Sequence, residues 1–250
     1  LDAYFHRGLA KHNLLDYTGA ILDYTKVIFH KPDADTYYNR GNSKFALQDY
    51  EGAKEDYTKA LELNKALTDA LFNLGLTQNY LGEFKEAIVN FDKITNMFPG
   101  ASNAYIQKGI AHMELKNYQE AFNNFGNSIL LDPSSNTFYT RGIALLSINY
   151  YKEAKADFYK ALELNKNNTS YYFYIGATHL FLGEFVPAIT AFTESIKSDA
   201  LDYDAYLGLS MAQFMANDKA QSKINFQKAT SIINRNTSHN ITIDVFNNTY

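Results

Sequence analysis

Six glycines recur along this chain at nearly constant intervals, and this spacing constrains the fold more than any other feature. The intervals are 33 or 34 residues throughout, and an alanine follows each glycine twelve residues later. The glycines are Gly8, Gly41, Gly75, Gly109, Gly142 and Gly176, and the alanines are Ala20, Ala53, Ala87, Ala121, Ala154 and Ala188. Two columns in phase mean that a whole structural unit is repeated. A repeat of this length predicts an all-α solenoid of antiparallel helix pairs.

Alignment on the glycines divides the chain into seven repeats, the last with Ser210 and Ser222 in the two columns. Each repeat contains two stretches of helical periodicity joined by a short polar turn, and it ends at a proline or an Asn-rich segment. The repeats are 1–33, 34–67, 68–101, 102–134, 135–168, 169–202 and 203–236. We therefore expect one domain over residues 1–236, followed by an irregular Asn-rich tail over 237–250.

Positions within a repeat are numbered from its first residue, so that Gly8 is position 8 and Ala20 is position 20. Minimal side chains at these two positions suggest that the glycine of one helix faces the alanine of the other, where two helices approach closely. Position 24 is always aromatic and is expected to fill the space around that contact. Its residues are Tyr24, Tyr57, Phe91, Phe125, Phe158, Phe192 and Phe226.

This pattern resembles the tetratricopeptide repeat family over about 236 residues. The family has Gly at position 8, Ala at 20, an aromatic at 24 and Pro at 32, and seven copies here agree in phase. The resemblance implies a right-handed superhelix and a role in binding other proteins. Position 11 departs from the family's Tyr, which we interpret as an unusual surface. Its residues are Lys11, Lys44, Gln78, His112, Leu145, His179 and Gln213.

Positions 7 and 23 vary together. Only the three repeats with Arg at position 7 carry Asp at position 23. The two positions lie at similar distances from the turn, so an antiparallel pair of helices would bring them level. We therefore predict three Arg–Asp bridges within repeats, namely Arg7 with Asp23, Arg40 with Asp56, and Arg141 with Asp157.

The resemblance also implies a binding surface. In this family the first helix of each repeat lines a concave groove, chiefly through positions 2, 5, 9, 12 and 13. Aromatic residues at positions 5 and 12 often support neighbouring repeats as well, whereas position 9 is usually polar, so the apolar run at position 9 is the stronger sign of a binding site. The candidate groove residues are Phe5, Leu9, Tyr38, Asn42, Phe45, Phe72, Leu76, Ile106, Ile110, Met113, Tyr139, Ile143, Leu146, Phe173 and Leu180.

Several classes of function are disfavoured. The net charge is -4 with charges of both signs interspersed, so no basic stripe exists to bind nucleic acid. The chain has no cysteine, and we find no phosphate loop, nucleophile motif or metal-binding motif. His112 and His179 are interpreted as surface or groove histidines. We predict no catalytic residue, no cofactor and no metal, and the uncharged run over 167–183 is too short for a membrane span.

One specialised ligand of the family is also disfavoured. Members that bind acidic chaperone tails clamp a terminal carboxylate with Lys at position 5, which this chain never has, and with further cations at positions 2 and 6. Position 2 carries instead Asp2, Asp35, Asp69, Asn103, Asn136, Ser170 and Asp204.

The first hypothesis is therefore a non-enzymatic scaffold that holds an apolar or amphipathic peptide in its groove. An alternative is a targeting or regulatory arm of a larger enzyme, with catalysis in a domain outside these residues. Because the chain begins directly on a repeat without an initiator Met, we interpret it as a fragment of a longer protein. RNA binding by a helical repeat is a third class, against which the acidic position 2 argues. We expect a soluble protein, and the cytoplasm is slightly favoured among compartments.

Overall fold

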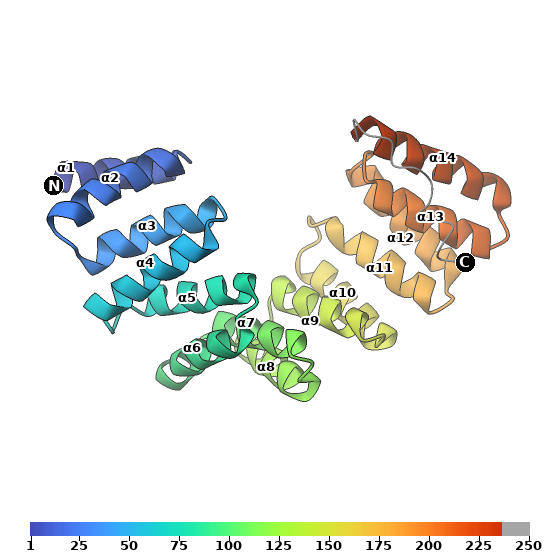
Figure 1. The fold of residues 1–250 in the computed structure, drawn as a ribbon. Coiled ribbons are helices and arrows are strands. Elements are labelled where there is room, and N and C mark those ends of the chain that lie inside the picture. Colours follow the sequence, from blue (N-terminus) through green and yellow to red (C-terminus); the bar gives the residue numbers. More distant parts are fainter. Residues whose placement is uncertain (237–250) are drawn as a thin grey trace. The chain divides into compact units, whose positions relative to one another are not determined.

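The computed structural model describes residues 1–236, and within them it contains fourteen α-helices and no strand. The chain forms two compact units, an N-terminal unit over Leu1–Asp132 and a C-terminal unit that begins at Pro133. Figure 1 shows each unit as a stack of helices in chain order. The N-terminal unit contains α1 (Asp2–Asn13), α2 (Tyr17–His30), α3 (Ala34–Ala46), α4 (Tyr50–Leu63), α5 (Thr68–Leu81), α6 (Phe84–Met97), α7 (Ser102–Glu114) and α8 (Tyr118–Leu131).

Each predicted repeat holds one helix pair, so the fold class predicted from the sequence is confirmed. Odd-numbered helices are the first helices of the repeats and even-numbered helices are the second. That all seven repeats form one continuous domain stays a prediction, and the predicted tail over 237–250 lies outside the described residues. The C-terminal unit contains α9 (Ser135–Ser147), α10 (Tyr151–Leu164), α11 (Ser170–Phe181), α12 (Phe185–Ser198), α13 (Tyr203–Met215) and α14 (Lys219–Asn236).

The turn within every repeat uses the same backbone conformation. Position 15 is left-handed in all seven repeats, with φ between 60° and 78°. Only two of these residues are glycines, although a side chain disfavours this conformation. The residues are Leu15, Gln48, Gly82, Lys116, Asn149, Gly183 and Asn217.

In repeats 1 to 6, the glycine at position 8 makes room for an aromatic ring. A Cβ atom built on Gly109 would lie 2.6 Å from the ring of Phe125, and one built on Gly41 would lie 2.8 Å from the ring of Tyr57. The nearest neighbour of the glycine is therefore the position-24 ring of its own repeat, and that it also faces the alanine stays a prediction. The alanines of position 20, such as Ala53, are themselves fully buried. A large flat ring needs the space that a missing side chain leaves.

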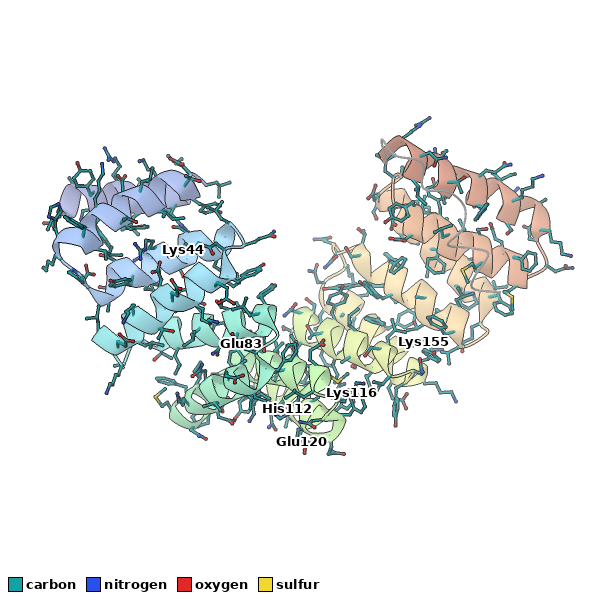
Figure 2. All side chains as sticks on the ribbon, viewed as in Figure 1. Lys44, Glu83, His112, Lys116, Glu120 and Lys155 are labelled. Atoms are coloured by element: carbon teal, nitrogen blue, oxygen red, sulfur yellow. The ribbon has the colours of Figure 1, made fainter. Side chains whose placement is uncertain are left out.

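The three predicted Arg–Asp bridges are all present. In repeat 2, Arg40 donates from Nε and Nη2 to the two carboxylate oxygens of Asp56, at 2.8 and 2.7 Å. The other two bridges have the same bidentate geometry. Lys44 of α3 (Figure 2) contacts the same Asp56 carboxylate at 2.9 Å. Because Asp56 is only 2% exposed, these cations compensate a buried charge.

Position 11 lies between the two helices rather than on an unusual surface, which corrects the interpretation from the sequence. Gln78 is buried and accepts a hydrogen bond from Asn90 at position 23, at 2.8 Å. Gln213 and Asn225 repeat this contact at 2.8 Å. His179, interpreted above as a surface or groove histidine, is 5% exposed and bonds to the hydroxyl of Tyr159 at 2.8 Å. Positions 11 and 23 therefore form one packing layer.

Candidate functional site

The first helices of the N-terminal unit lie side by side, tied by side-chain hydrogen bonds. His12 of α1 bonds Ser43 of α3 at 2.8 Å, and Asn73 of α5 donates to Asn42 of α3 at 2.9 Å. The helical period puts positions 2, 5, 9 and 12 on one stripe of each helix. We call the surface formed by these positions of α1, α3, α5 and α7 the first-helix face. It contains the candidate groove residues of this unit.

A cavity of about 210 Å³ opens on the first-helix face. Three of the candidate residues, Asn42, Phe45 and Leu76, line it together, although they come from two repeats. The cavity combines apolar walls with a small polar group, which is typical of sites that bind a ligand. Its complete lining is His12, Asn42, Phe45, Ala46, Tyr57, Asn73 and Leu76.

Asn42 organises the polar side of this cavity. Its Oδ1 accepts two hydrogen bonds, from the Tyr57 hydroxyl at 2.8 Å and from Asn73 Nδ2 at 2.9 Å. Burial raises the pKa of Tyr57 well above its usual value, so this hydroxyl stays protonated and can donate. The Nδ2 group of Asn42 has no acceptor among residues 1–236. It is therefore free to donate to a ligand in the cavity.

His12 contributes an uncharged wall. Burial lowers the pKa of His12, so the ring is neutral near pH 7. Its Nδ1 bonds the Ser43 hydroxyl at 2.8 Å, and its ring packs edge-on against Tyr17 with centroids 5.1 Å apart. The cavity therefore holds no charged side chain among its lining residues at neutral pH.

The position-5 residues have a second, structural task. Phe5, Tyr38 and Phe72 each contact the position-24 ring of their own repeat, with ring centroids 5.7–6.1 Å apart. Ile106, the position-5 residue of α7, is 4% exposed and offers almost no surface to a partner. The remaining candidates of this unit, Leu9, Ile110 and Met113, are half-buried.

The C-terminal unit has a different face. Its candidates are also half-buried, and Tyr139 contacts the rings of Tyr171 and Tyr174 at 5.4 and 5.3 Å. Ile143 and Phe158 occupy the positions of Asn42 and Tyr57, so the polar group is replaced by apolar side chains. The other candidates of this unit are Leu146, Phe173 and Leu180.

A second cavity, of about 330 Å³, lies in the C-terminal unit beside Phe173, at the end of α11 that is remote from Leu180. Of its polar residues, only Ser170 and Asp204, at position 2, were named from the sequence. Its lining is Thr169, Ser170, Phe173, Tyr174, Ser195, Ser198, Asp199, Asp202 and Asp204.

Tyr57 and Asn73 line the first cavity but were not among the candidate residues predicted from the sequence. A signal was nevertheless present, because repeat 2 alone combines Asn at position 9 with Tyr rather than Phe at position 24. A buried hydroxyl requires a hydrogen-bond partner, and Asn42 is the group that supplies it. Repeat 1 has the same tyrosine but Leu9 at position 9, and the Tyr24 hydroxyl is buried without a partner within residues 1–236.

Because only one of the two tyrosine hydroxyls has a partner, replacing Tyr by Phe should change the free energy of unfolding in opposite directions in repeats 1 and 2. Tyr24→Phe should raise the free energy of unfolding by about 1 kcal/mol, because it removes a buried hydroxyl that has no partner. Tyr57→Phe should lower it by about 1 kcal/mol, because it removes the hydrogen bond to Asn42. Urea denaturation of the two variants beside the unmodified protein measures both values. Equal effects of the same sign would contradict this assignment.

In residues 1–236, no group of three or more His, Cys, Asp or Glu is placed to hold a metal ion. None of the helices described is both long enough and apolar enough to cross a membrane.

Comparison with protein families gives matches over more than half of the chain. Models of the tetratricopeptide repeat match residues 34–66, 69–101, 102–135 and 135–168. No curated protein sequence matches the chain significantly.

Solved structures match the fold at low sequence identity. A tetratricopeptide repeat protein from Parabacteroides merdae aligns with a TM-score of 0.73 and 16% identity, over 97% of this chain and 94% of that one. MamA aligns with a TM-score of 0.61 and 21% identity, over 66% of this chain and 98% of its own. YrrB, described as a repeat protein with an unusual peptide-binding site, aligns with a TM-score of 0.59 and 24% identity, over 72% and 93%. At these low sequence identities, the matches show a similar fold and nothing more specific.

Proposed function

Because the chain belongs to the tetratricopeptide repeat family, we propose that it is a protein-interaction scaffold whose first-helix face holds an apolar or amphipathic peptide segment. The observation that carries this proposal is the cavity around Asn42. There, apolar walls from Phe45 and Leu76 adjoin an amide group that lacks an acceptor. YrrB shares the fold and is described as having a peptide-binding site, which agrees with a peptide ligand.

The cavity suits a peptide in two ways. An apolar side chain of the ligand would be removed from water between Phe45 and Leu76, which contributes about 25 cal/mol for each Å² buried. A carbonyl of the ligand backbone would accept a hydrogen bond from Asn42 Nδ2. This donor is held in place because Tyr57 and Asn73 fix the opposite end of the amide. We assign no catalytic role to residues 1–236.

The test uses peptides selected from a random 12-residue library for binding to the whole chain. We expect Leu76→Glu combined with Ile110→Glu to weaken binding of the selected peptides at least about tenfold, because a carboxylate would be buried beneath an apolar ligand. Both residues are half-buried, so the melting temperature should change little. Calorimetric titration and thermal melts measure the two quantities.

Val89→Glu combined with Leu130→Glu serves as the matched control. Val89 on α6 and Leu130 on α8 are 53% and 84% exposed, so these two changes add the same two charges on second helices, away from the first-helix face. It should leave peptide affinity unchanged. If the double variant unfolds, Leu76 and Ile110 are structural and the binding site lies elsewhere; if the control weakens binding equally, the effect is not specific to the face.

A further inference from the structure

The cations of the first helices in the N-terminal unit are all engaged with second helices. Asp23 of α2 binds both Arg7 and Lys11, and Asp56 of α4 binds the corresponding pair in repeat 2. Lys108 of α7 contacts Asp92 of α6 at 2.5 Å. No other Lys or Arg occurs in α1, α3, α5 or α7. The first-helix face is therefore left without a Lys or Arg charge.

Three carboxylates remain on that face. Asp2, Asp35 and Asp69 occupy position 2 of α1, α3 and α5, and all three are exposed. Within residues 1–236 their side chains have no ion pair and no hydrogen bond. The other ionisable groups of these helices that border the face are His6, His12 and Glu114, so no Lys or Arg within these four helices offsets the three carboxylates.

The three carboxylates form a row beside the proposed peptide site. Position 2 precedes position 9 by seven residues, which is two helical turns and about 10 Å along the helix axis. Adjacent first helices lie close enough for side-chain hydrogen bonds of 2.8 and 2.9 Å, so their axes are about 10 Å apart. The row Asp2, Asp35, Asp69 thus runs parallel to Leu9, Asn42 and Leu76, across the same three helices. An extended peptide advances about 3.3 Å per residue, so three residues span one step of this row.

We infer that the segment held by the N-terminal unit is basic as well as apolar, with Lys or Arg side chains about three residues apart that face Asp2, Asp35 and Asp69. This inference rests on the proposed function and names the chemistry of the partner. The charge complementarity is the reverse of the cationic clamp that takes acidic tails. It favours a basic amphipathic peptide and disfavours an acidic one.

The test compares three fluorescein-labelled 12-residue peptides, in which Leu-Lys-Ser, Leu-Gln-Ser or Leu-Glu-Ser is repeated four times. Fluorescence anisotropy measures their binding to the whole chain. In 50 mM salt we expect the Lys peptide to bind about tenfold more tightly than the Gln peptide, and the Glu peptide to bind most weakly. At 500 mM salt the Lys advantage should fall below about twofold, because exposed charges are screened.

Two charge-matched triple variants locate the effect. Asp2→Asn, Asp35→Asn and Asp69→Asn together should abolish the advantage of the Lys peptide over the Gln peptide. The control is the triple variant Glu55→Gln, Glu86→Gln and Glu120→Gln, which removes three exposed carboxylates from the second helices α4, α6 and α8. It should keep the advantage, since net charge changes equally in both variants.

The outcomes separate this inference from the proposed function. Equal affinity for the Lys and Gln peptides, with loss of both on Leu76→Glu, would overturn the basic partner and leave the peptide site standing. An advantage lost equally in the control variant would also overturn it, because net charge alone would then explain the attraction. Failure of all three peptides and of every library-selected peptide to bind the face would contradict the peptide site itself.

Discussion

Gly109→Ala is expected to destabilise the chain by about 2 kcal/mol, whereas Gly126→Ala in the same repeat should stabilise it by about 0.5–1 kcal/mol. A Cβ at Gly109 would lie 2.6 Å from the buried ring of Phe125, and that ring has no exposed surface toward which to shift. Overpacking of this kind costs about 1–3 kcal/mol. A Cβ at Gly126 meets nothing within 4 Å, so only the gain in helix propensity remains.

Urea denaturation followed by circular dichroism measures both variants. Because repeat arrays unfold partly repeat by repeat, hydrogen exchange of α7 and α8 should also show the change locally. The two substitutions are identical in chemistry and lie in the two helices of one repeat, so each is the control of the other. Stabilisation by both would mean that the glycine column reflects something other than ring packing.

Removal of one partner from the repeat 2 bridge is the second large effect that we expect. Asp56→Asn should cost about 3 kcal/mol, because Arg40 and Lys44 then lose the buried carboxylate that compensates them. Arg40→Leu should cost about 2 kcal/mol, since Lys44 still contacts Asp56 at 2.9 Å. In a double-mutant cycle the two changes should couple by about 1–2 kcal/mol.

Repeat 3 supplies the control for this cycle. It carries Leu74, Gln78 and Asn90 at positions 7, 11 and 23, where Asn90 donates to Gln78 at 2.8 Å. The triple variant with Arg40→Leu, Lys44→Gln and Asp56→Asn reproduces this set in repeat 2 and should recover most of the lost stability. Additive single effects, or a triple variant no more stable than the double one, would show that the three positions do not act together.

These positions show what the sequence could predict. The Arg–Asp bridges followed from covariation, because an ion pair needs both partners and the antiparallel geometry brings positions 7 and 23 level. Covariation of positions 11 and 23 could also have predicted that these two residues pair, but we did not predict it. The pairing Gln78 with Asn90 recurs as Gln213 with Asn225. The departure from the family's Tyr at position 11 was interpreted as an unusual surface, although a polar residue at position 23 in the core pairs with it.

The candidate site was predictable in part. The resemblance to the family supplied the groove positions 5, 9 and 12, and it identified Asn42, Phe45 and Leu76, which share a cavity. It did not identify Tyr57. Position 24 is a core position, and Tyr57 belongs to the site only because its hydroxyl donates to Asn42. Nor did it separate Ile106, which is buried, from Phe72, which is half-buried, since both occupy position 5. Exposure depends on how neighbouring helices cover each residue, and the period of one helix does not contain that information.

The left-handed turns that lack glycine are positions at which substitution by glycine should stabilise the fold. Leu15, Gln48 and Lys116 hold φ near 60° with a full side chain, where glycine at Gly82 and Gly183 has no steric penalty. A side chain costs about 1–2 kcal/mol in that conformation. The turn residues join the two helices of a repeat and do not line the cavity around Asn42. A lineage of such chains could therefore accept destabilising changes in the lining of that cavity and offset them with glycine in the turns. The cavity and the stability of the fold can thus change through separate sets of residues.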